Sequence, residues 1–377
     1  MKLVFGLLPW ILLCLWDRDT LRIEAEGSPE LLEILVGRFE RPPPEHFEMR
    51  LARVTEELSA GAELNLFDDA AVACDRLGRS DEAIEWMVRK RETLDRLQSS
   101  DPEHEYRYLA NLGTFHAHRW LSGDRLDPGD LERARNLIRA AIKLNPEAHF
   151  GRERYQLIAI ETLLDSTTKT ETKPERESIV SRIFEGQVND PARDGLKAAG
   201  YDDAVEGLSG LIFLGEAWES PLVWHSLQQA LMERGDAFLA RLAELRIVEL
   251  ASGSSPSAEF GAHVDLWSAR GIIEPTDLKR LDRWWERARA SAETWQQRRT
   301  AYASERYLAG LHPDTHDGFW DDWDGLPALP RAPGKLIRVI QFAAAVASRL
   351  VLPLIAVVLA VTLVTRWLLR RRRRSPS

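Results

Sequence analysis

Residues 71–87 read Ala-Val-Ala-Cys-Asp-Arg-Leu-Gly-Arg-Ser-Asp-Glu-Ala-Ile-Glu-Trp-Met, and this stretch decides the fold. Just before and inside it, Phe67 and Cys74 belong to a set of apolar residues spaced by three and four positions, which places them on one face of a helix. Gly78 ends that helix, because glycine adopts a positive φ at little cost. A second helix opens at the small polar and acidic residues that follow. The stretch therefore predicts two short helices joined by a tight turn.

Two later stretches repeat the pattern. Residues 109–146 end in Asn-Pro and carry a longer loop, residues 121–130, between their halves. Residues 221–240 form a weaker copy without a closing proline. Helical hairpins that cross closely at small residues resemble the tetratricopeptide repeat (TPR) family. The positions expected to pack in the three hairpins are Phe67, Cys74, Gly78, Ala83, Met87, Leu112, Gly113, Ala134, Ile138, Ala141, Pro146, Trp224, Gly235 and Ala240.

The resemblance covers roughly a quarter of the chain and implies an α-solenoid, a stack of hairpins that binds protein or peptide segments. The alternative is an ordinary all-helical domain whose helices pair; in either case the fold class is all-α. The expected segments are a linker at 17–44, a TPR-like helical region at 45–165, a polar loop and linker at 166–202, a second helical region at 203–310 and an acidic, aromatic, proline-rich stalk at 311–335.

A long helix is predicted over residues 276–307, where apolar residues alternate at three and four positions. Trp285 and Trp295 lie on that seam. The seam either packs on the hairpins of the same chain or pairs with another copy. The second alternative makes the protein a self-associating subunit of an envelope complex.

Both ends of the chain indicate a membrane. Residues 1–16 have one lysine followed by an apolar run, which is typical of a signal sequence or an N-terminal membrane segment. Residues 336–369 form a membrane segment whose core, 350–369, has the length of one spanning helix. The tail, 370–377, is basic and is expected in the cytoplasm by the positive-inside rule. The arginines that set this orientation are Arg370, Arg371, Arg372, Arg373 and Arg374. The body is then expected to be periplasmic, on the outer face of the inner membrane.

Charge separates the body from the tail. The chain has 50 basic and 59 acidic residues. Residues 335–377 contain nine of the basic residues and no acid, so the body is more acidic than the net charge of −9 indicates. An acidic body repels phosphate, which argues against nucleic-acid binding and favours a basic or neutral partner.

Motifs for catalysis are missing from the sequence. It has no Gly-x-Ser-x-Gly, no phosphate-binding glycine loop and no His-Glu-x-x-His. Residues 322–325 resemble the start of a calcium loop but lack its later glutamate. We therefore expect no enzyme activity, no cofactor and no metal, and we expect a scaffold for a protein or peptide partner, either as a monomer or as a homo-oligomer.

Overall fold

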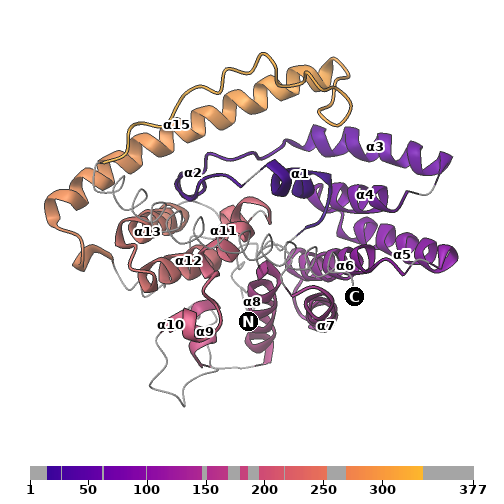
Figure 1. Ribbon diagram of the computed structural model, residues 1–377, viewed down its shortest axis with the longest axis horizontal. Coiled ribbons are helices and arrows are strands. Elements are labelled where there is room, and N and C mark those ends of the chain that lie inside the picture. Colours follow the sequence, from indigo (N-terminus) through magenta and orange to yellow (C-terminus); the bar gives the residue numbers. More distant parts are fainter. Residues whose placement is uncertain are drawn as a thin grey trace, which may run out of the picture. The chain divides into compact units, whose positions relative to one another are not determined.

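The computed structural model describes residues 15–26, 28–61, 63–98, 100–146, 151–168, 179–185, 195–215, 217–252 and 269–333. Every regular element within those ranges is a helix, which confirms the all-α prediction (Figure 1). The α-helices are α1 (Arg18–Glu26), α2 (Leu31–Val36), α3 (Pro44–Ala60), α4 (Leu64–Arg76), α5 (Ser80–Leu97), α6 (Pro102–Ser122), α7 (Gly129–Leu144), α8 (Arg152–Thr168), α9 (Ile179–Glu185), α10 (Gly195–Ala198), α11 (Ala204–Phe213), α12 (Pro221–Glu233), α13 (Ala237–Ser252) and α15 (Pro275–Leu308), and two short 3₁₀ helices are η3 (Ala217–Glu219) and η4 (Ala269–Gly271).

The predicted hairpins form around their glycines. Gly78 has a φ of 74° between α4 and α5, and Gly235 has a φ of 84° between α12 and α13. Only glycine adopts this left-handed conformation readily, so each chain reversal is set locally. A third hairpin, α6 with α7, uses the longer loop predicted from the sequence.

Successive helices from α3 to α8 pack on their neighbours in chain order. The crossing of α6 and α7 is close because Gly113 has no side chain: a Cβ at that position would lie 2.9 Å from Cδ1 of Ile138. Leu112 and Phe115 continue the core between α4, α5 and α6. Burial of these apolar faces stabilises the stack by about 25 cal/mol for each Å² removed from water.

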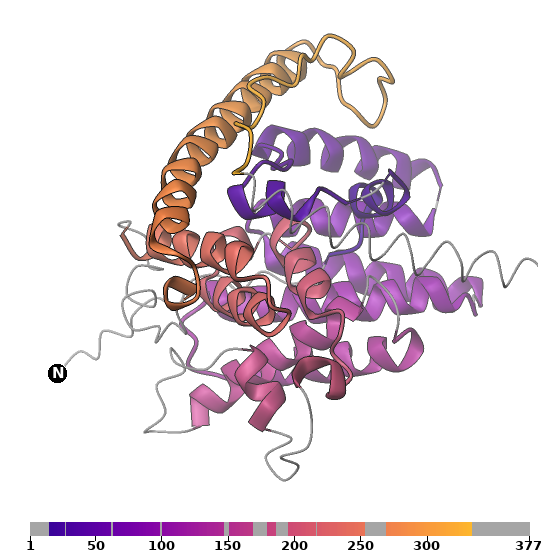
Figure 2. The same cartoon turned by 60° about the vertical axis from the view of Figure 1, so that its left-hand side comes forward.

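The long helix predicted at 276–307 is α15, and it packs on the same chain. It contacts α13, α2 and α3 (Figures 1 and 2). Trp285 and Trp295 are only 7% and 8% exposed. The apolar seam is therefore covered by the chain's own residues, as the first of the two alternatives predicts.

Residues 311–335 were predicted to form a stalk. In the structure, residues 311–330 instead fold back along α15. Phe319 is buried against Tyr307 of α15. The indole N–H of Trp284 donates to the carbonyl of Pro330 at 3.0 Å. Trp320 and Trp323 of this segment are half-buried, and each places its ring 5.4 Å from that of Tyr302 on α15.

Two segments predicted as linkers also contain core. Within 17–44, Leu35 and Val36 of α2 are fully buried. Within 166–202, α9 buries Ile179 and Ile183, and Leu196 of α10 is also buried. These helices are too short for a sequence periodicity to stand out, so tertiary packing decides their structure.

Among the described helices, none is both long enough and apolar enough to span a bilayer. The predicted span at 336–369 and the arginine tail lie outside the described residues, as do residues 1–14. The last two residues of the predicted N-terminal segment are described: Leu15 and Trp16 are 1% and 4% exposed. They belong to the helical body, so the boundary predicted after residue 16 is placed too late.

Candidate functional site

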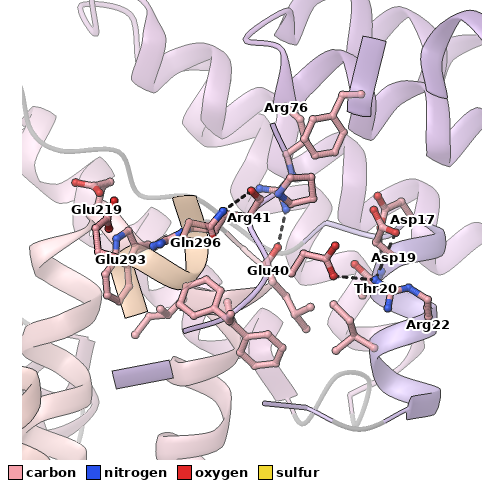
Figure 3. Close-up of a pocket in the computed structure, with 18 residues that line it drawn as sticks. Asp17, Asp19, Thr20, Arg22, Glu40, Arg41, Arg76, Glu219, Glu293 and Gln296 are labelled. Atoms are coloured by element: carbon pink, nitrogen blue, oxygen red, sulfur yellow. Dashed lines mark hydrogen bonds and ion pairs between the residues drawn. The ribbon is translucent and has the colours of Figure 1, made fainter. Parts of the chain in front are cut away.

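A cavity in the described part of the chain has a volume of about 490 Å³, within the range of ligand-binding pockets. Segments far apart in sequence enclose it: α1, the connection from α2 to α3, the end of α11 with η3, and α15. Its lining residues are Asp17, Asp19, Thr20, Arg22, Ile23, Phe39, Glu40, Arg41, Pro42, Phe47, Arg76, Ile212, Phe213, Leu214, Trp218, Glu219, Glu293 and Gln296 (Figure 3).

An aromatic group forms one wall of the cavity. The rings of Phe39 and Trp218 meet edge to face with centroids 5.5 Å apart, and Trp218 meets Trp224 in the same way at 5.4 Å. Gly37 admits the indole of Trp218, because a Cβ there would lie only 2.6 Å from Cζ2 of that ring. Gly37 also has a φ of 78°, and it ends α2.

Three guanidinium groups surround the indole of Trp218. Arg246, Arg41 and Arg289 lie 3.9, 4.9 and 5.1 Å from its ring centroid. Arg246 and Arg289 both pair with Glu249, at 3.1 and 2.9 Å. Burial lowers the pKa of Arg41 to about 10, and repulsion from Arg289 and Arg246 acts in the same direction while Glu293 opposes it. Arg41 remains charged at neutral pH, so this wall presents a cation next to apolar rings.

The opposite wall is held by Arg50 of α3, whose side chain is fully buried. Its guanidinium donates to Asp19 at 2.8 Å and to Asp17 at 3.3 Å, and it forms a two-pronged pair with Asp314 at 2.8 Å. Arg53 adds a second contact to Asp314 at 2.6 Å. One arginine thus joins the segment before α1, α3 and the segment after α15.

The two aspartates on this wall titrate differently. Burial raises the pKa of Asp17, and the neighbouring Asp19 raises it further. Burial also acts to raise the pKa of Asp19, but Arg50 and His46 outweigh it and hold that pKa well below its usual range. Both carboxylates are hydrogen-bonded to Arg50. We interpret them as parts of the wall that are fixed in place.

Charged groups stand at both ends of the cavity. Figure 3 shows Asp17, Asp19, Thr20 and Arg22 at one end, Glu219, Glu293 and Gln296 at the other, and Glu40 with Arg41 between them. The lining has five carboxylates and three guanidinium groups. Asp17 and Asp19 are already paired with Arg50. The rings therefore supply contact area for a bulky apolar side chain, and the attraction for a basic neighbour comes from Glu219 and Glu293 at the other end of the cavity.

His312, next to Arg50, makes stability depend on pH. Its ring stacks on His46 at 4.5 Å, and Asp314 lies 3.5 Å away. Burial lowers its pKa to about 4; His46 and Arg50 also lower it, and Asp314 opposes them. An unfolded histidine titrates near 6.5, so between about pH 6.5 and 4 the unfolded chain binds more protons and stability falls as the pH falls.

We expect this histidine to remove about 2 kcal/mol of stability between pH 7 and pH 5. Urea unfolding at the two pH values measures the loss, and His312→Asn should lose correspondingly less than the wild type. His316→Asn is the control, since His316 is exposed in the same segment. An equal loss in the wild type and in His312→Asn would show that His312 does not titrate as described.

The predicted packing positions lie in the helical stack and do not line the cavity. The side chains of Cys74, Ala83, Met87, Ala134, Ile138, Ala141, Trp224 and Ala240 are fully buried, Phe67 and Leu112 are nearly so, Gly78, Gly113 and Gly235 lie at turns or crossings, and Pro146 is exposed after α7. The sequence prediction missed the cavity because its walls come mainly from the segment treated as a linker and from two residues each of α11 and α15. The run Leu-Leu-Glu-Ile-Leu-Val of α2 was the available signal that this linker is packed.

No group of three or more histidine, cysteine or acidic residues in the described part of the chain has the geometry to hold a metal ion. Comparison with family models, with curated proteins and with solved structures finds no match to this chain.

Proposed function

We propose that this chain is a membrane-anchored scaffold of TPR-like helical hairpins that binds a segment of a partner protein in the 490 Å³ cavity. The observation that carries the proposal is the lining itself: aromatic rings on one side, with Glu219 and Glu293 at the end of the cavity away from Asp17 and Asp19. The expected ligand is a peptide segment that presents a bulky apolar residue beside a lysine or arginine.

The membrane part of the proposal comes from the sequence. Residues 350–369 have the length of one spanning helix, and the arginines at 370–374 favour a cytoplasmic tail. With the tail inside, the body and its cavity face the periplasm. The acidic body then favours a basic partner in that compartment.

The alternative is self-association through residues 276–307. Its main support was an apolar seam that includes Trp285 and Trp295. Because both side chains are covered by the same chain, that seam offers little apolar area to a second copy. Binding of a different protein is therefore the better-supported function.

The experiment uses tagged full-length protein purified from solubilised native membranes. Glu293→Lys reverses one charge of the cavity at an exposed position of α15, and Glu286→Lys makes the same change at an exposed position of α15 that does not line the cavity. We expect Glu293→Lys to recover about tenfold less of a basic partner, about 1.4 kcal/mol of binding free energy. Equal recovery with the wild type, Glu293→Lys and Glu286→Lys would place the partner elsewhere on the protein.

A further inference from the structure

Residues 15–18, which lead into α1 and include its first residue, lie across α4 and α6 in the manner of a bound peptide. The amide side chain of Asn111, on α6, contacts both backbone polar groups of Trp16. Its Oδ1 accepts from the N–H of Trp16 at 2.8 Å, and its Nδ2 donates to the carbonyl of Trp16 at 2.9 Å. A side-chain amide that pairs with the N–H and the carbonyl of one residue recognises the backbone of that residue, whatever side chain the residue carries.

The side chains of this segment fill sites on the same surface. Leu15 packs into the core cluster that contains Phe67 of α4 and Phe115 of α6. The indole of Trp16 meets the ring of Tyr106 edge to face, with centroids 5.2 Å apart. These two side chains are the apolar anchors of the segment.

The third contact is ionic. Asp69 of α4 accepts from the backbone N–H of Arg18 at 3.0 Å and from its guanidinium at 2.7 Å. Asp69 is 2% exposed, and Asn111 is fully buried. Both polar side chains are thus covered, and both bond to the backbone of residues 16 and 18, although Asn111 also donates to Asp68 at 3.2 Å.

We propose that the surface of α4 and α6 is a second peptide-binding groove and that residues 15–18 are its built-in ligand. The groove adjoins the cavity, because Asp17 of the built-in ligand also lines the cavity. The groove takes a segment with the order aliphatic, tryptophan, aspartate, arginine. A partner segment of this chemistry competes with residues 15–18 for the groove. Because the built-in ligand is tethered, it acts at a high effective concentration and keeps the groove closed to weaker competitors.

The test measures binding of a fluorescein-labelled peptide with the sequence of residues 15–22 to the full-length protein in detergent. The double variant Leu15→Ser/Trp16→Ala empties the two apolar sites, and we expect it to bind the peptide at least tenfold more tightly than the wild type. Adding Asn111→Leu to the double variant replaces the amide by an apolar group of similar volume, so the hydrogen bonds to the peptide backbone are lost. We expect the triple variant to bind the peptide no more tightly than the wild type does. A peptide of the same composition in scrambled order is the control.

Two results overturn the proposal: a folded double variant that binds the peptide no better than the wild type does, or a gain that survives Asn111→Leu. Should the double variant show no thermal transition, Trp16→Phe replaces it, since the smaller ring keeps an aromatic contact with Tyr106. The peptide then raises the Tm of Trp16→Phe by several degrees if the groove accepts it in trans, and an unchanged Tm contradicts the proposal.

Discussion

Replacing Arg50 by methionine is expected to lower the free energy of unfolding by about 3 kcal/mol or more. The substitution keeps most of the aliphatic length but removes the guanidinium bonded to Asp17, Asp19 and Asp314, and of the three Asp314 keeps contacts with Arg53 and Arg18. Removal of one partner from a buried ion pair typically costs about 3–5 kcal/mol, because the remaining charge is desolvated and unpaired. Chemical denaturation monitored by tryptophan fluorescence measures the loss.

Arg53→Met is the matched control for Arg50→Met. Arg53 lies one turn further along α3, pairs with Asp314 and Glu57, and is 21% exposed at its side chain. We expect a loss of about 1 kcal/mol or less, as for other partly exposed pairs. If Arg50→Met loses no more than Arg53→Met, then Arg50 does not hold the three segments together.

Replacing Gly37 by alanine is expected to destabilise the protein by about 2–4 kcal/mol and to deform the cavity. Two penalties add: a left-handed φ of 78°, which disfavours any Cβ, and a clash of that Cβ with the indole of Trp218. The first costs about 1 kcal/mol, and forcing extra volume into a packed site costs about 1–3 kcal/mol. Because Trp218 lines the cavity, partner recovery should fall together with stability.

Gly78→Ala separates the two penalties. Gly78 has a φ of 74°, close to that of Gly37, but a Cβ there would meet nothing within 4 Å. The control variant should therefore lose only about 1 kcal/mol, and its partner recovery should match the wild type. Equal losses in Gly37→Ala and Gly78→Ala, measured by urea denaturation, would mean that Trp218 moves aside without penalty.

Local signals carried most of the fold prediction. Gly78 marked a turn that its backbone conformation explains, and apolar spacing located α15 to within one residue at each end. The residues that specify a helical hairpin lie within one short stretch of sequence, so the hairpin can be predicted without tertiary information. The long helix with Trp285 and Trp295 was likewise predictable from the sequence. Whether its apolar seam packs on the same chain or on another copy was not, and the structure shows that both tryptophans are covered by the same chain.

The candidate site could not be predicted in the same way. Arg50 contacts Asp17 and Asp314, which lie far from it on either side in the chain, and no spacing rule links such residues. The segment after α15 reads as a polar stalk because its aspartates and prolines dominate its composition. Its role depends on one buried aromatic residue, Phe319, and on ion pairs to α3, which only the folded chain brings together.

The most direct test of partner binding in the cavity is site-specific photocrosslinking in living cells. A benzophenone amino acid replaces Phe213, which lines the cavity, or Leu126, which is 71% exposed in the loop between α6 and α7. We predict that position 213 yields a defined adduct with a second protein, that Glu293→Lys weakens this adduct, and that position 126 yields none. Absence of an adduct at 213, or the same adduct from both positions, would contradict binding in the cavity.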